Sequence, residues 1–225
     1  MKVILFGATG MVGQGVLREC LLDPDVTLVL AVVRTSTGQH HPKLVEVLHQ
    51  DFFDYAAIAD RLADFDACFF CLGVSSAGMS EARYRRVTYD LTLAAARALL
   101  ERSPAVTFVY VSGLGTDSTA RGRIMWARIK GETENALLAM PFRAAYMFRP
   151  AMIQPLHGVT PKAGMMRAFH AVIAPLLAVL KAVAPRYVTT TENVGRAMLA
   201  VAKRGAPKPV LESSDIDRIA RDLSS

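Results

Sequence analysis

Three glycines near the beginning of the chain have the spacing of a phosphate-binding turn. Gly7, Gly10 and Gly13 follow the apolar run 3–6, which is too short for a helix and predicts a buried strand. In such a turn the first glycine lets the backbone reverse, the second lets it approach a pyrophosphate, and the third allows the next helix to pack closely on the strand. The positive end of that helix would face the phosphates. The stretch therefore predicts a dinucleotide site, although the same glycines would also close an ordinary strand-to-helix turn. The cofactor-binding residues assigned to it are Gly7, Thr9, Gly10, Met11, Val12 and Gly13.

The residue after the second apolar run bears on which dinucleotide is bound. Arg34 directly follows the predicted strand 26–33, and no Asp or Glu occurs between residues 26 and 43. At this point of the fold an acidic residue binds the ribose hydroxyl of NAD, whereas an arginine accommodates the 2′-phosphate of NADP. We therefore predict NADP as the cofactor; the alternative is an arginine that only contacts solvent from a loop.

Two further cofactor-binding candidates follow the next strands. Asp51 comes after the predicted strand 44–50, where a side chain can reach the adenine, and Gly73 comes after the predicted strand 67–72. A glycine there would let the backbone pass beside the cofactor, and an ordinary turn glycine is the alternative.

Catalytic candidates follow the fifth predicted strand, 106–111. Ser112 comes directly after it, and open α/β sheets bind ligands beyond the carboxyl ends of their strands. We therefore expect Ser112 to project toward the cofactor cleft. Trp126 and Lys130 lie four residues apart on the predicted helix 123–140 and so share one face of it.

Strands and helices alternate along the chain with short connections, which is typical of a doubly wound parallel sheet. We predict one α/β domain of the Rossmann type over residues 1–225, in which residues 151–190 form a small C-terminal substrate-side or lid region. Part of the tail beyond residue 209 is expected to be mobile. The remaining predicted elements are the helices 55–62, 81–101 and 192–202 and the strand 144–149.

The amino-acid composition limits the class of protein and the kinds of partner that are possible. With 225 residues and 52% hydrophobic content, the chain can bury a large core. The net charge of +6 is divided into −2 for residues 1–110 and +8 for residues 111–225. This asymmetry permits an anionic substrate, an acidic partner or nucleic acid, but without basic runs or interleaved aromatic residues we expect no nucleic-acid binding. The partners considered are a small-molecule substrate and a second copy of the chain in a homodimer.

The cysteines and histidines predict neither a disulfide framework nor a metal site. Cys68 and Cys71 lie three residues apart on a predicted strand, so they would point to opposite faces as core residues. The histidines lack metal-ligand spacing with carboxylates or thiolates, and we predict no metal. The lack of a disulfide framework and of a signal peptide indicates a reducing, cytoplasmic location.

The segment 165–184 is strongly apolar. Its uncharged run 171–180 contains Pro175 and is too short to span a bilayer core of about 30 Å, so we expect no transmembrane helix. A buried helix, an apolar substrate wall and a membrane-surface contact remain as alternatives for this segment.

Five short motifs mark the chain between residues 1 and 155. They are GATGMVGQG at the start, CLG at the end of the fourth strand, VSGLG after the fifth strand, WARIK, and FRP after the sixth strand. Together they resemble the atypical short-chain dehydrogenase/reductases, and within them the small NAD(P)-binding proteins of the TIP30-like group. In that family a serine polarises the substrate carbonyl, a tyrosine donates the proton, and a lysine four residues later binds the nicotinamide ribose. The resemblance implies the first and last of these roles for Ser112 and Lys130.

Trp126 stands where this family has its tyrosine. An indole N–H does not ionise near neutral pH and cannot serve as a general acid, so Trp126 is either part of an altered catalytic site or an aromatic lid over the nicotinamide. Other proton donors would be Tyr84, Tyr110, Thr116, Ser118 or a relayed water. The leading hypothesis is an NADP-dependent reductase of an unknown carbonyl substrate. The alternative is a non-catalytic protein that senses NADP(H) and binds a partner.

Overall fold

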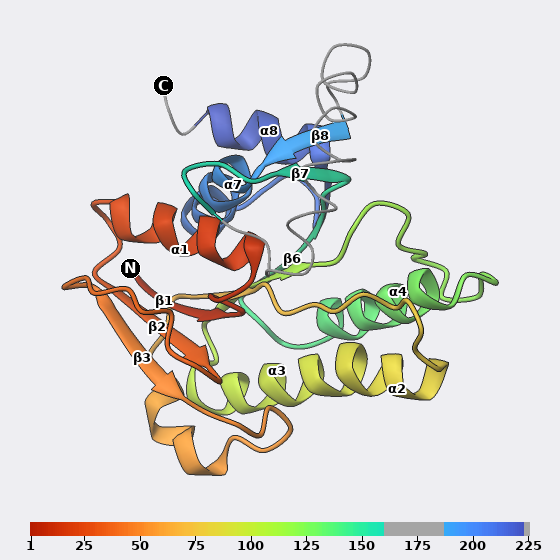
Figure 1. The fold of residues 1–225 in the computed structure, drawn as a ribbon, viewed down its shortest axis with the longest axis horizontal. Helices are drawn as coiled ribbons and strands as arrows, with labels where there is room; N and C mark the ends of the chain where they lie inside the picture. Colours follow the sequence, from red (N-terminus) through yellow and green to blue (C-terminus); the bar gives the residue numbers. More distant parts are fainter. Residues whose placement is uncertain (160–186, 223–225) are drawn as a thin grey trace.

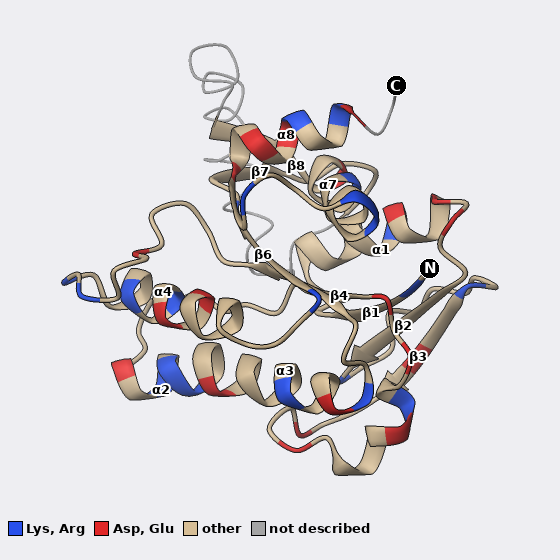
Figure 2. Ribbon diagram, turned by 180° about the vertical axis from the view of Figure 1, so that it is seen from behind, with Lys and Arg blue, Asp and Glu red and all other residues tan. Residues whose placement is uncertain are grey.

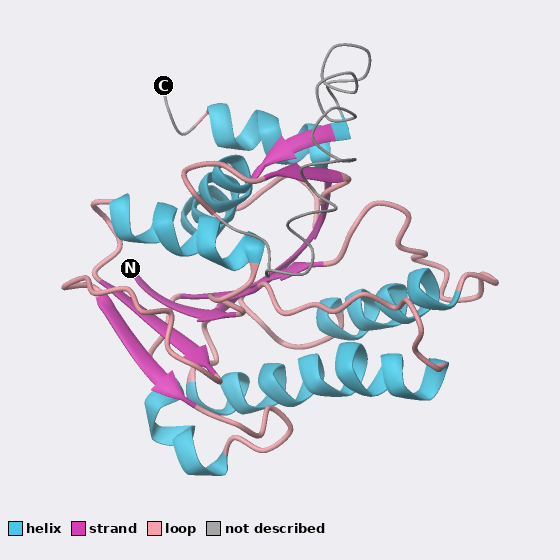
Figure 3. Cartoon of the chain, viewed as in Figure 1, coloured by secondary structure: helices cyan, strands magenta, loops and turns pink. Residues whose placement is uncertain are grey.

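A parallel β-sheet forms the middle layer of the protein, with helices on both of its faces (Figures 1 and 3). The computed structural model describes residues 1–159 and 187–222. The strand order is β3-β2-β1-β4-β5-β6-β9, and all neighbouring strands of this sheet pair in parallel. This is the doubly wound arrangement of a Rossmann fold, as the sequence predicts. The strands are β1 (Lys2–Phe6), β2 (Leu28–Val33), β3 (Leu44–Leu48), β4 (Ala67–Phe70), β5 (Thr107–Val111), β6 (Ala144–Arg149) and β9 (Val210–Glu212).

Burial on both faces explains the unbroken apolar runs of the central strands. In β1, Val3 and Leu5 pack into the core on one face, whereas Ile4 and Phe6 pack into the core on the other. The first core is covered by α1 (Met11–Leu22), α7 (Thr191–Arg204) and α8 (Ser213–Arg221). The second is covered by the 3₁₀-helix η1 (Ala56–Leu62), by α3 (Leu91–Arg102) and by α4 (Met125–Leu138). Acidic and basic residues are interspersed along the helices of this second face (Figure 2).

The predicted helix 81–101 consists of three consecutive pieces. They are α2 (Glu81–Arg85), the π-helical turn η2 (Arg86–Asp90) and α3. The hydroxyl of Ser80 accepts a hydrogen bond from the Arg83 backbone N–H and so caps the start of α2. A single wide turn barely changes the apolar periodicity, which is why the sequence did not indicate it.

The expectation of a mobile tail beyond Pro209 is wrong for the residues up to 222. β9 extends the sheet by pairing with β6, and α8 follows it directly. Glu212 and Asp215 form a capping box at the start of α8, and Ile216 and Ile219 are buried beneath it. A three-residue strand is too short to leave a recognisable pattern in the sequence.

The predicted substrate-side region 151–190 is described only at its two ends. There, β7 (Met152–Gln154) and β8 (Val188–Thr190) pair in parallel as a separate two-stranded sheet. The side chain of Thr190 then caps α7 by accepting from the Asn193 backbone N–H. The apolar segment 165–184 and the alternatives proposed for it lie outside the described residues.

We predict that Gly13→Ala destabilises the fold by about 1–3 kcal/mol, because overpacking forces backbone shifts. A Cβ atom on Gly13 would lie 2.0 Å from the carbonyl oxygen of Gly7, where α1 packs on the end of β1. Urea unfolding measures the change. Gly73→Ala is the control, since a Cβ atom there meets nothing within 4 Å; equal stabilities of the two variants would contradict the packing role of Gly13.

Candidate functional site

The glycine-rich turn has the geometry of a phosphate cradle. Gly7 has a φ of +85°, and a Cβ atom on it would lie 2.7 Å from the carbonyl carbon of Cys71. Gly10 is the N-cap of α1, whose N-terminus receives no side-chain cap and whose first turn contains no acidic residue. The N-terminal N–H groups of α1 are therefore available to an anion, and a pyrophosphate fits this turn.

Two adjoining cavities lie along the carboxyl ends of the strands. The first has a volume of about 540 Å³ and the second about 820 Å³. They share the lining residues Gly10, Cys71, Leu72, Gly73 and Val74, so they are two compartments of one groove that meets the glycine-rich turn. This shape matches a dinucleotide whose two halves lie on either side of its pyrophosphate.

The first compartment contains the residues predicted for the adenosine half. Thr9, Arg34 and Asp51 line it, and the side chains of Arg34 and Asp51 are exposed to solvent. The Asp51 carboxylate accepts a hydrogen bond from the Phe53 backbone N–H at 2.9 Å. Within the described ranges, Arg34 forms no ion pair, so its guanidinium is available to a ligand.

Of the remaining turn residues, Met11 and Val12 line the second compartment, together with Gly10 and Gly73. Gly13 lines neither compartment and instead lies in the contact between α1 and β1. Cys68 and Cys71 pack on opposite faces of the sheet, as predicted. Cys71 additionally lines both compartments, which the sequence analysis missed by treating it only as a core residue.

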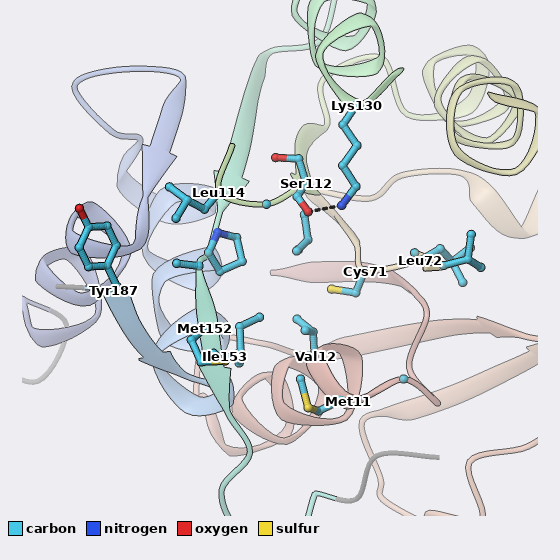
Figure 4. Close-up of a pocket in the computed structure, with 17 residues that line it drawn as sticks. Met11, Val12, Cys71, Leu72, Ser112, Leu114, Lys130, Met152, Ile153 and Tyr187 are labelled. Carbon is cyan, nitrogen blue, oxygen red and sulfur yellow. Dashed lines mark hydrogen bonds between the residues drawn. The ribbon is translucent and has the colours of Figure 1, made fainter. Parts of the chain in front are cut away.

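Ser112 and Lys130 lie together at one end of the second compartment (Figure 4). The Lys130 ammonium donates a hydrogen bond to the backbone carbonyl of Ser112. Burial lowers the pKa of Lys130 below its ordinary value, and the nearby Glu134 carboxylate opposes that shift. The structure thus brings these two predicted residues into direct contact.

The hydroxyl of Ser112 is directed toward a buried ion pair. It lies 2.5 Å from Oε1 of Glu134 and 3.1 Å from the carbonyl oxygen of Phe148. The Arg149 guanidinium binds both oxygens of the Glu134 carboxylate, and Glu134 is only 1% exposed. Arg149 also donates to the Ser118 hydroxyl at 2.6 Å. This pair was not predicted from the sequence, although Glu134 lies one helical turn after Lys130 and Arg149 belongs to the FRP motif.

Trp126 is half-buried and packs against the loop after β5. Its ring lies 3.3 Å from the position that a Cβ atom on Gly115 would take. Trp126 does not belong to the described lining of either compartment. Its assignment as a catalytic or lid residue therefore stays a prediction.

None of the other proton donors considered from the sequence, Tyr84, Tyr110, Thr116 and Ser118, belongs to the described lining of either compartment. Tyr84 and Tyr110 are buried, and burial raises the pKa of both phenols. The Thr116 hydroxyl donates to the Gly113 carbonyl at 2.7 Å. Tyr187, which the sequence analysis did not consider, lines the second compartment at the edge opposite Lys130 (Figure 4).

A family model described as NAD(P)H-binding matches residues 7–144. The chain belongs to the NAD(P)H-binding family. This match, together with the fold, confirms the resemblance to the atypical short-chain dehydrogenase/reductases. A solved oxidoreductase of the short-chain dehydrogenase/reductase family from Burkholderia thailandensis has the same fold, with a TM-score of 0.65 at 18% identity. That similarity covers 99% of this chain and 96% of the other.

Curated relatives of this NAD(P)H-binding protein include fungal proteins named fmp52. The protein fmp52 of Emericella nidulans is 28% identical over 159 residues, which are 68% of this chain and 66% of the relative, slightly less than two thirds of its length. The protein fmp52-2 of Aspergillus oryzae is 26% identical over 226 residues, 97% of this chain and 96% of the relative. Both are named as mitochondrial proteins, and this finding overturns the expectation of a cytoplasmic location.

Neither a membrane-spanning helix nor a cluster of metal ligands occurs in the part of the chain that the structure describes. No helix within 1–159 and 187–222 has both the length and the apolar character needed to cross a bilayer. The same ranges contain no group of three or more His, Cys, Asp or Glu side chains arranged to hold a metal ion.

Proposed function

We propose that this protein is an NADP(H)-dependent reductase of a carbonyl compound. The observation that carries the proposal is the two-compartment groove, which has an exposed arginine at one end and the Ser112–Lys130 pair at the other. NADP(H) would supply a hydride at the second compartment. The test is the loss of NADPH absorbance with a panel of aldehydes and ketones.

Each proposed binding role follows from the position of a residue in the groove. Arg34 would contact the 2′-phosphate and Asp51 the adenine, because both line the first compartment. The turn from Gly7 to Val12 would hold the pyrophosphate. Lys130 would bind the nicotinamide ribose from its place in the second compartment.

Ser112 has one hydroxyl proton, and this proton is within reach of the Glu134 carboxylate. To polarise a substrate carbonyl, the hydroxyl would have to exchange that partner for the substrate. Its backbone carbonyl, by contrast, already holds the Lys130 ammonium. The Ser112 carbonyl would therefore hold Lys130 in the present arrangement. The Ser112 hydroxyl would have to leave Glu134 before it could bind a substrate.

Trp126 favours a second candidate function. A protein that keeps the nucleotide groove but carries an indole in place of the family's phenol would bind NADP(H) without rapid turnover. Such a protein would report the cofactor's redox state to a partner. A native protein that binds NADPH but reduces no carbonyl would support this alternative.

Replacing Arg34 by alanine should weaken NADPH binding by about 1.5–3 kcal/mol, the range for hydrogen bonds to charged groups, and leave NADH binding nearly unchanged. The difference arises because only NADPH carries the 2′-phosphate. Calorimetric titration of both cofactors measures it, with Arg97→Ala, an exposed arginine of α3, as the matched control. Equal losses for the two cofactors, or tighter binding of NADH than NADPH by the native protein, would reject the NADP assignment.

A further inference from the structure

The lining of the second compartment divides into two parts. One part comes from the glycine-rich turn and the end of β4, and most of it is shared with the first compartment. The other part comes from the ends of β5 and β6, from β7, from Lys130 and from Tyr187. The cofactor would occupy the first part and contact Lys130 through its nicotinamide ribose, so the rest of the second part is the space left for a substrate.

This substrate wall is built mainly from apolar side chains. Leu114, Met152 and Ile153 line the same compartment as Ser112 and Lys130 (Figure 4). The wall continues onto apolar surface at its mouth, where Leu114 is 45% and Tyr187 38% exposed. An apolar ligand would remove this surface from water, which stabilises the complex in proportion to the area buried.

Lys130 is the only charged side chain among the described residues that line this compartment. Its ammonium is already bound to the Ser112 carbonyl, and burial lowers its pKa. The nearby Arg149 is bound to Glu134 and does not belong to the described lining. A carboxylate or phosphate on the substrate would therefore lose its hydration without gaining a bidentate cation.

We propose that the substrate is an uncharged aliphatic ketone or aldehyde, with its carbonyl toward Ser112 and Lys130 and its chain along Leu114, Met152 and Ile153. This inference rests on the proposed reductase function. The carbonyl carbon accepts a hydride from NADPH and the oxygen accepts a proton from solvent. The product is the alcohol, and NADPH is oxidised to NADP⁺.

The first experiment compares 2-butanone, 2-hexanone, 2-octanone and 2-oxooctanoate as substrates of the full chain with NADPH. Burying one CH₂ group is worth about 0.8 kcal/mol, so each added CH₂ should raise kcat/KM about fourfold. The gain from 2-butanone to 2-octanone should then reach roughly 10²-fold. 2-Oxooctanoate keeps the alkyl chain but has a carboxylate in place of the C1 methyl group, and its kcat/KM should fall at least about tenfold below that of 2-octanone.

A second experiment measures binding without turnover. Saturation-transfer NMR of the protein without cofactor should show 2-octanone bound more tightly than 2-oxooctanoate. Met152→Lys adds a cation to the wall and should reverse this order, and Leu114→Lys should act in the same direction from a more exposed position. Leu48→Lys is the matched control, because Leu48 is 64% exposed and lines neither compartment.

The two experiments separate the substrate class from the reductase function. If carbonyls are reduced but chain length has no effect, or 2-oxooctanoate is preferred, the substrate class is wrong while the function stands. If NADPH binds and no carbonyl is reduced, yet 2-octanone binds and Met152→Lys weakens it at least tenfold, the ligand class stands and the function is wrong. If 2-octanone shows no saturable binding to the native protein, the inference is overturned.

Discussion

Replacing Trp126 by tyrosine should raise the rate of carbonyl reduction by about 10²–10⁴-fold, the usual contribution of general acid catalysis. The new phenol would lie one helical turn before Lys130, on the same face of α4. A neighbouring ammonium lowers the pKa of a phenol from about 10 toward neutrality, because it stabilises the phenolate. The indole packs against Gly115, next to Leu114 of the second compartment, and the smaller phenol would have to turn from this position toward the compartment to donate its proton. NADPH consumption with 2-octanone measures the gain.

Two control variants distinguish the effect of the new phenol from the other effects of replacing the indole. Trp126→Phe removes the indole without adding a proton donor, so it should give no gain. Trp126→Tyr combined with Lys130→Ala should lose most of the gain, because the charge that lowers the phenol pKa is gone. A native protein that is already active and loses activity in Trp126→Tyr would show that another group donates the proton. If both proteins bind NADPH and neither reduces any carbonyl, the sensing function replaces the reductase function.

The sequence carried enough information for the fold and for the nucleotide-binding half of the groove, because those features depend on local patterns. Gly7, Gly10 and Gly13 are spaced by the geometry of one turn, and the same turn is found in the structure. Arg34 and Asp51 could be assigned from the ends of the strands that precede them. Parallel strands end at one edge of a sheet, so strand order alone brings these residues to the same groove.

The substrate half could not be predicted in the same way, because its contacts join distant parts of the chain. Glu134 on α4 meets Arg149 at the end of β6 only through the packing of the helix on the sheet. Tyr187 reaches the cavity because β8 pairs with β7, two strands too short to be recognised from their sequences. Cys71 belongs to the groove because Gly7 approaches it closely, and strand periodicity indicated only which face it occupies.

The buried ion pair between Glu134 and Arg149 should dominate the stability of the region around Ser112. Removing one partner of such a pair leaves the other charge buried without compensation, which costs about 3–5 kcal/mol. In Glu134→Ala the partners of the Arg149 guanidinium among the described residues would be the Ser118 hydroxyl at 2.6 Å and, more distant, the Glu212 carboxylate at 3.7 Å. We therefore expect Glu134→Ala to lower the free energy of unfolding by about 3–5 kcal/mol, measured by urea denaturation.

A matched control lies two residues earlier on the same helix. Glu132 pairs with Arg85, but their side chains are 28% and 42% exposed, so Glu132→Ala should cost only about 0–1 kcal/mol. Replacing both buried partners, as in Glu134→Leu with Arg149→Met, should recover much of the loss, because no charge is then left unpaired. A double-mutant cycle over these variants isolates the coupling between the two residues. If Glu134→Ala lowers the free energy of unfolding no more than Glu132→Ala does, the buried ion pair does not stabilise the region around Ser112. The hydrogen bond between the Ser112 carbonyl and Lys130 would then form without support from this pair.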